Sequence, residues 1–90
     1  MGMTSARKAQ EVVRNTRWCL AIELLAGCQA IDLVGLRPGR GVDAAHRAIR
    51  AVVPRLGEDR VLHRDIDAID ALLASGAVRR AVEGEVGALA

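Results

Sequence analysis

Glu23 is the residue of this 90-residue chain whose setting most suggests chemistry, because it interrupts an apolar stretch from Trp18 to Ile31. If that stretch is a helix, the side chains three and four positions away are its neighbours. Those four positions hold small or apolar residues, so no base of the same helix can neutralise the carboxylate. Enclosed by other helices, Glu23 could act as a general acid or base. We favour the alternative, a structural carboxylate bonded to an arginine or a backbone donor at a helix contact, because no pocket can be inferred around it.

Histidines and cysteines are the other residues that could carry chemistry. His46 and His63 are isolated in the sequence, without a His-Glu-x-x-His pair, a Cys-x-x-Cys or an evident third ligand. We expect them to be surface or loop residues, and we expect no metal site. Cys19 and Cys28 are nine positions apart, which places them on opposite sides of one helix, so they cannot bridge each other. Both are expected to be small core residues rather than reactive thiols.

Four arginines, Arg37, Arg40, Arg47 and Arg50, could form a phosphate-binding patch. The net charge of only +2 and the absence of stacking aromatic residues around them do not favour nucleic acid. We expect instead a solvated face whose arginines pair with the acidic residues of segment 57–75. The loop that contains Arg37 and Arg40 lacks the spacing and the lysine of a phosphate-binding loop.

Length and composition limit the elements that position these residues. Ninety residues allow one domain, and we treat 1–90 as a single helical module. Hydrophobic residues make up 51% of the chain and aromatic residues 1%, so burial depends largely on Ala, Leu, Val and Ile, which favours helices. The apolar stretch is shorter than the ~20 residues that span a bilayer, and no secretion signal is recognisable. We therefore expect a cytoplasmic protein with reduced thiols and no membrane partner.

Hydrophobic periodicity predicts an all-α fold. One long helix is expected from about Ser5 to Leu33, followed by shorter amphipathic helices at about 43–53, from Asp65, and around 78–89. Asp65 is the expected N-cap of the third helix, Pro54 the stop of the second, and Gly76 a C-terminal cap. The long helix carries two apolar stripes. The first comprises Val13, Leu20, Leu24, Cys28 and Ile31, and the second comprises Val12, Cys19, Ile22, Ala26 and Leu33.

Two uncovered stripes on one helix exceed what so small a chain can bury. The long helix is therefore expected to be buried on all sides within a larger helical bundle. Its first turns hold Arg7 and Lys8, where the helix dipole disfavours cations, and no acidic residue precedes Glu11. These features indicate a module that packs against something larger than itself.

Read as a string, residues 1–33 resemble the C-terminal helical region of the aromatic amino-acid ammonia-lyases, the family of histidine, phenylalanine and tyrosine ammonia-lyases and aminomutases. The resemblance continues downstream over nearly the whole chain. It rests there on Arg50, Val53, Pro54, Asp59-Arg60, Leu62, Asp65-Ile66 and Ser75-Gly76. The chain departs from the family at Arg64, where proline is common before the Asp-Ile pair, and in its Arg-Pro-Gly-Arg-Gly loop.

The resemblance implies a role without catalytic residues. The family's methylidene-imidazolone group forms from an Ala-Ser-Gly triad that lies far upstream of this region. The family's Gln-Glu-Asp-like catalytic stretch comes just ahead of the position that matches Met1. Ala74-Ser75-Gly76 has the same letters, but we expect it to be a helix C-cap. We therefore expect no catalytic, cofactor-binding or metal-binding residue, and no cofactor, in this chain.

The expected function is that of a structural segment. In this interpretation the chain completes a helical bundle with copies of itself or with a separate N-terminal lyase chain. The alternative is a stand-alone helical interaction protein of lyase ancestry that forms homo-oligomers through the surface around Leu20, Leu24 and Ile31. The sequence identifies no substrate.

Overall fold

The computed structural model describes residues 2–35, 37–55 and 62–89, and over that part the chain contains helices and no strands. The predicted all-α fold is confirmed. Four helices follow one another: α1 (Gly2–Val34), α2 (Arg40–Arg50), α3 (Leu62–Ser75) and α4 (Ala77–Val86). Asp59-Arg60, which contributed to the family resemblance, lies outside the described residues.

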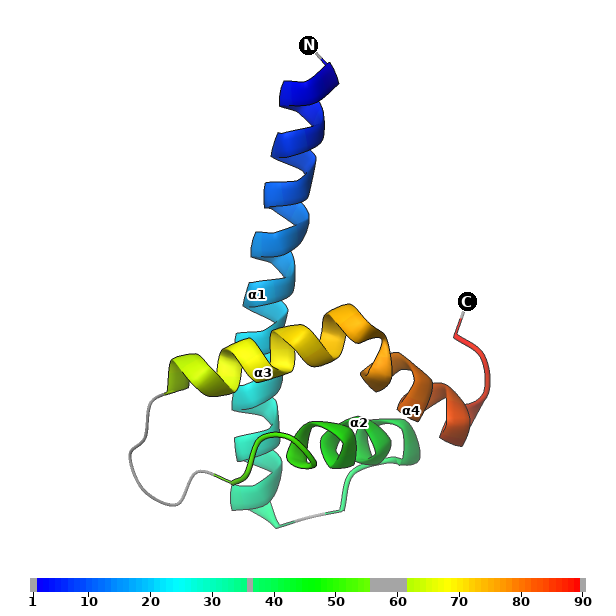
Figure 1. Cartoon of the computed structure of the whole chain (residues 1–90). Coiled ribbons are helices and arrows are strands. Elements are labelled where there is room, and N and C mark those ends of the chain that lie inside the picture. The colour runs from blue at the N-terminus through cyan, green and yellow to red at the C-terminus, as the bar shows by residue number, and fades with distance from the viewer. Residues whose placement is uncertain (1, 36, 56–61, 90) are drawn as a thin grey trace.

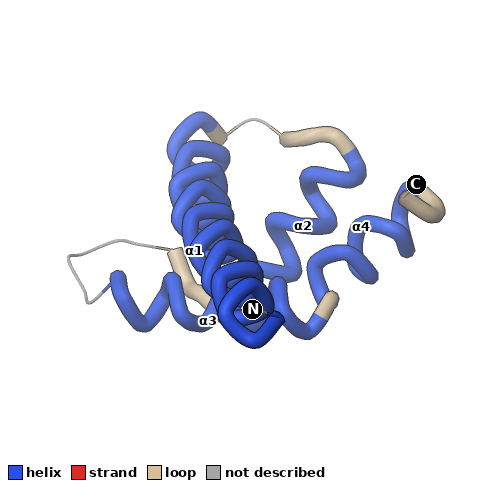
Figure 2. The backbone as a smooth tube through the Cα atoms, turned by 90° about the horizontal axis from the view of Figure 1, so that it is seen from above, coloured by secondary structure: helices blue, strands red, loops and turns tan. Residues whose placement is uncertain are grey.

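Helix α1 dominates the shape of the molecule. At about 1.5 Å per residue its 33 residues extend for roughly 50 Å, which accounts for the longest dimension of 51 Å. Figure 1 shows α3 crossing the C-terminal half of α1, while the N-terminal half projects beyond the other helices. Seen along α1, the remaining helices extend to either side of it, α3 on one side and α2 with α4 on the other (Figure 2).

The core is small and lies where the helices converge. Its buried residues are Ala21, Cys28, Ile49, Val53 and Ile69. Partly buried leucines of α1 and α3, such as Leu24, Leu25 and Leu72, pack around them. Helix α2 lies against α4, with Gly41 beside the side chains of Val82 and Val86.

This chain alone does not bury α1 on all sides, as expected of a helix with two apolar stripes in so small a chain, and its burial within a larger bundle stays a prediction. Ala21 and Cys28 face the core, whereas Val12, Cys19 and Leu33 are exposed. The reason is geometric: three short helices cover only one side of α1, and all residues from 4 to 16 are exposed. Cys28 is the core residue that was expected, and the same expectation for Cys19 is wrong.

Several helix ends differ from the predicted positions. Helix α2 begins at Arg40 and ends at Arg50, and a turn occupies the residues before Pro54, so the proline does not itself end the helix. Asp65 lies inside the first turn of α3 instead of capping it. Gly76 has φ +78° and follows α3 directly, which confirms the predicted C-terminal cap.

Candidate functional site

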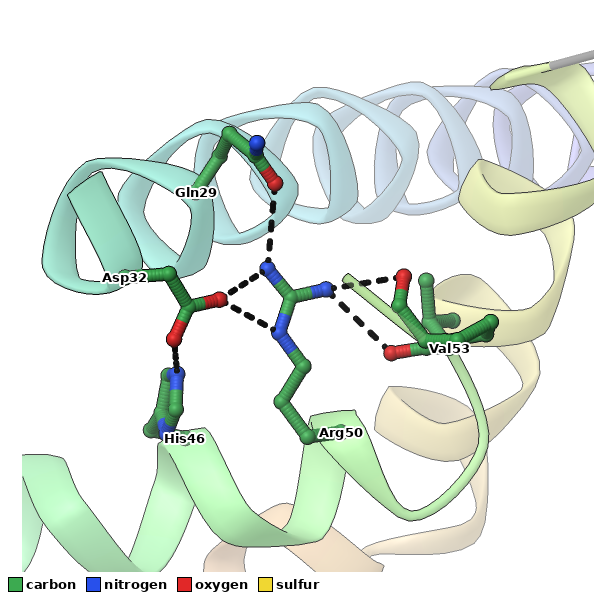
Figure 3. Close-up of polar contacts among 6 residues, drawn as sticks. Gln29, Asp32, His46, Arg50 and Val53 are labelled. Atoms are coloured by element: carbon green, nitrogen blue, oxygen red, sulfur yellow. Dashed lines mark hydrogen bonds and ion pairs between the residues drawn. The ribbon is translucent and has the colours of Figure 1, made fainter. Parts of the chain in front are cut away.

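Polar side chains gather where the C-terminal end of α1 meets α2. His46 and Arg50 are one helical turn apart on α2, so both point to the same side of that helix, toward Asp32 of α1 (Figure 3). The three side chains are only 14 to 18% exposed. We refer to Asp32, His46, Arg50 and Gln29 as the α1–α2 junction.

Arg50 is the centre of this junction. Its Nη2 and Nε atoms donate to Asp32 Oδ2 at 2.6 and 2.9 Å, and Nη2 also donates to Gln29 Oε1 at 3.3 Å. Its Nη1 donates to the backbone carbonyls of Val53 and Pro54, both at 3.2 Å. All three guanidinium nitrogens are therefore bonded, and one side chain ties together α1, α2 and the turn that follows α2.

Asp32 receives partners on both oxygens. His46 Nε2 lies 3.0 Å from Oδ1, while Arg50 occupies Oδ2. Burial alone would raise the pKa of Asp32, but the hydrogen bonds and charge of Arg50, assisted by His46, outweigh it and lower that pKa. The carboxylate is thus held in its charged form, as expected of a structural ion pair.

The junction has no reactive group beside it. A His–Asp pair can orient a general base, but a nucleophile must lie within reach of the imidazole. Cys28 is the nearby candidate, and its burial raises the pKa of the thiol, an effect that Arg50 opposes and Asp32 reinforces. A protonated buried thiol is a packing group rather than a nucleophile.

The structure corrects the prediction for Glu23. Glu23 is exposed and makes no hydrogen bond or ion pair with any part of the chain that the structure describes. Within the described residues, the expected arginine or backbone donor is therefore not found beside Glu23. Glu23 lines a shallow, mostly apolar pocket of about 120 Å³ between α1 and α2, together with Leu24, Ile31 and Val42.

The two histidines differ from each other. His63 is exposed on α3, with its ring centroid 5.5 Å from that of Trp18 and its Nε2 3.3 Å from Asp67 Oδ2, so the expected surface position is confirmed. His46 is not a surface or loop residue, because it is enclosed in the α1–α2 junction. Within the described ranges, no three residues of ligand type come together as a metal site.

The arginines form ion pairs, but not with α3 as expected. Arg47 pairs with Asp43 at 3.1 Å and with Glu85 at 3.5 Å, and Arg40 donates to the carbonyl of Glu85. Arg50 pairs with Asp32 of α1, and Arg37 is exposed. On α3, Asp70 accepts from Arg17 Nε of α1 at 2.6 Å.

Sequence reasoning missed Asp32, Gln29 and the Arg17–Asp70 pair. A partial signal was present, since His46 and Arg50 have the spacing that places two side chains on one helix face. What the sequence lacked was the angle at which α2 meets α1. That angle, and not local spacing, decides which acid the pair reaches.

Comparisons with known proteins identify the family. The family model described as aromatic amino acid lyase matches residues 1–51. The histidine ammonia-lyase of Anaeromyxobacter sp. (strain K) is 56% identical over 77 residues, which cover 84% of this chain and 15% of that protein. The histidine ammonia-lyase of Sorangium cellulosum (strain So ce56) is 54% identical over 90 residues, which cover 99% of this chain and 18% of that protein.

The similarity covers only part of each relative. The histidine ammonia-lyase of Gloeobacter violaceus is 47% identical over 90 residues, again 99% of this chain and 18% of the relative. The chain therefore spans less than a fifth of the length of these relatives and corresponds to their C-terminal part. No solved structure matches it. Since the family model covers more than half of the residues and the relatives are about half identical, the chain belongs to the aromatic amino acid lyase family.

Proposed function

We propose that this chain is a structural segment of a histidine-type ammonia-lyase assembly and supplies no catalytic residue of its own. The observation that carries the proposal is α1, which buries one side in this chain and exposes a second apolar stripe along the other. Val12 and Leu33, near the two ends of that stripe, are 63% and 71% exposed. Apolar surface of this extent on one helix favours burial against further helices.

The kind of assembly follows from the relatives. Their names state that they are histidine ammonia-lyases, and this chain resembles their C-terminal part. Deamination of histidine would then be an activity of the assembly, whose active site comes from a separate N-terminal lyase chain and whose remaining helices come from that chain or from copies of this one. In either case we place the assembly in the cytoplasm. Among the described residues no helix is long and apolar enough to cross a membrane.

The residues of this chain do not fit the family's prosthetic group. Ser75 closes α3, where its hydroxyl donates to the Leu72 carbonyl at 2.7 Å and accepts from the Ala77 amide at 3.2 Å. The Gly76 amide donates to the Leu73 carbonyl at 3.1 Å. Ala74-Ser75-Gly76 is therefore a hydrogen-bonded helix end, as expected, and not the strained loop that cyclisation requires. The methylidene-imidazolone would have to form from residues outside this segment.

Complementation tests the proposal. The histidine ammonia-lyase of Sorangium cellulosum would be truncated to remove the part that matches this chain, and it would be produced alone or together with the full 90-residue chain. We expect the two chains to copurify and ammonia release from histidine to return. A matched control carries Val12→Asp and Leu33→Asp, which place charges on the exposed stripe and leave the core of this chain intact.

Two outcomes would count against the proposal. If the truncated lyase regains neither binding nor activity, although the chain is folded by circular dichroism, the assembly role is wrong. A stable homo-oligomer that ignores the truncated lyase would support the alternative, a stand-alone interaction protein of lyase ancestry. The same exposed stripe favours that alternative, so the lyase partner must be present for the two to be distinguished.

A further inference from the structure

A small apolar pocket lies open between α1 and α2. Its volume is about 120 Å³, and the side chains that form its walls include Leu24, Cys28, Ile31, Val42 and Ile49. Ile49 is 1% exposed and Val42 is 55% exposed, so the pocket leads from the solvent to the core. Sites that bind small molecules usually have volumes of about 300–1,000 Å³. This pocket is much smaller and has room for one side chain of another protein.

Gly27 leaves the pocket open on the α1 side. It lies inside the helix and forms part of the pocket wall, and a Cβ at this position would meet nothing within 4 Å. Glycine is less favourable than alanine in the interior of a helix. At this position it exposes the backbone of α1, so another chain can approach the pocket closely.

One carboxylate at the pocket has no counter-ion. Glu23 is exposed and makes no hydrogen bond or ion pair within the described ranges. The other polar side chains of the pocket are His46, whose Nε2 lies 3.0 Å from Asp32 Oδ1, and Cys28, which is buried. A side chain that enters the pocket therefore meets apolar walls and the negative charge of Glu23.

This combination selects a basic side chain. Lysine and arginine have a long apolar stem and a cationic head, so the stem can lie in the pocket while the head reaches the carboxylate. A wholly apolar side chain would cover Glu23 and remove its hydration without providing a partner, which costs free energy. An acidic side chain would be repelled.

The position of Glu23 connects the pocket with the exposed stripe of α1. Cys19, Glu23 and Gly27 are each four residues apart, so their directions around the helix differ by only ~40° from one to the next. Cys19 belongs to the exposed stripe, and Gly27 belongs to the pocket. A partner that covers the stripe at Cys19 can therefore extend a long side chain past Glu23 into the pocket.

We propose that this pocket receives a lysine or arginine side chain of the separate lyase chain, with its stem between α1 and α2 and its charged head on Glu23. The inference rests on the proposed function and deepens it, because it specifies one side chain that the partner must provide. It also gives Glu23 the ion-pair partner that this chain does not supply within its described residues.

The pocket can be tested in the full chain without any lyase, so its failure is separate from a failure of complementation. The probe is butylguanidinium, which has the aliphatic stem and the charged head of arginine. It should shift the nuclear magnetic resonance signals of the Gly27 amide and the Val42 methyl groups in a saturable way. The neutral control pentanol, and butylguanidinium added to Glu23→Gln, should bind about fivefold more weakly. Equal binding of the two probes, or no saturable shift, would overturn the proposal.

Charge reversal tests the pocket in the assembly. Glu23→Lys should raise the dissociation constant for the truncated lyase of Sorangium cellulosum by about tenfold or more, because two cations would then meet. Glu11→Lys is the matched control: it makes the same charge change about three turns away on α1 and should alter the constant less than about twofold. Binding that Glu23→Lys leaves unaltered would overturn this proposal alone. A truncated lyase that does not bind the unchanged chain would overturn the proposed function as well.

Gly27→Ala separates binding from folding. Its methyl group should raise the midpoint of thermal unfolding and partly fill the pocket, so the chain should become more stable and yet bind the truncated lyase several-fold more weakly. Gly84→Ala is the matched control, because Gly84 lies inside α4, away from the pocket, and a Cβ there also meets nothing within 4 Å. It should raise the midpoint and leave binding unchanged. A more stable Gly27→Ala chain that binds as tightly as the unchanged chain would show that no side chain enters the pocket.

Discussion

Asp32 links two helices and the turn that follows the second of them. Through Arg50 and His46 it connects the last turn of α1 with α2, and the same arginine holds the carbonyls of Val53 and Pro54. The two helices otherwise touch along a short apolar contact around Cys28 and Ile49. The polar junction therefore adds to the apolar packing that holds α1 against α2.

Asp32→Asn should lower the midpoint of thermal unfolding by several degrees at neutral pH, because Arg50 loses its counter-ion while it stays largely enclosed. The pKa of Asp32 is lower in the folded chain, so its contribution to stability is present above the unfolded pKa of ~3.9 and disappears as pH falls through the folded pKa. The unchanged chain and the variant should therefore converge in acid. Unfolding curves by circular dichroism at neutral and acidic pH measure this.

Asp67→Asn is the matched control for the junction. Asp67 is 54% exposed and pairs only with the exposed His63, so its loss should change the midpoint little at any pH. A difference between Asp32→Asn and the unchanged chain that persists undiminished in strong acid would show that packing, and not the charge of Asp32, is responsible.

At the scale of the elements, two glycines should respond oppositely to alanine. Gly76 has φ +78°, a conformation that a Cβ strains, so Gly76→Ala should destabilise the chain by roughly 1 kcal/mol. Gly27 lies inside α1 and a Cβ there would meet nothing within 4 Å, so Gly27→Ala should stabilise it by roughly 0.5–1 kcal/mol. Urea unfolding of both variants measures the difference, and equal signs would contradict the helix boundaries.

The contact between α1 and α3 depends on Ile69, which is completely buried. Ile69→Ala should lower the free energy of unfolding by about 2–5 kcal/mol, since it removes three methyl or methylene groups from a small core. Val34→Ala, at a position 65% exposed, is the control and should change it by about 0.5 kcal/mol or less. Urea unfolding again gives both values, and similar losses at the two positions would mean that the core lies elsewhere.

These elements could largely be predicted from the sequence, because their signals are local. The 3.6-residue periodicity predicted α1, and the glycine after Ser75 predicted the end of α3. Helix starts were less accurate: Asp65 has the residue type of an N-cap, yet α3 begins at Leu62. The junction and the exposure of Glu23 could not be predicted, since both depend on how helices cross, which local periodicity does not determine.

For the whole molecule, α1 is much longer than the body it belongs to. Its residues 4–16 are all exposed, and the ion pair between Arg17 and Asp70 joins α1 to α3 directly after them. A helix of that length without tertiary contacts is marginal in water, because propagation of the helix barely offsets the entropy of ordering it. The projecting half is therefore the part of the fold that most requires a partner.

Hydrogen exchange measures this dependence directly. In dilute solution, where the chain is monomeric, amides of residues 4–16 should exchange at least a hundredfold faster than those of residues 21–32, because only the latter are protected by the core. At concentrations that favour pairing of two α1 helices, or with the truncated lyase present, protection should extend to residues 4–16 while the amides of α4 stay unchanged. Uniform protection of α1 at every dilution would instead show that the helix is stable without a partner. The exposed stripe would then be no reason to place this chain in a larger assembly.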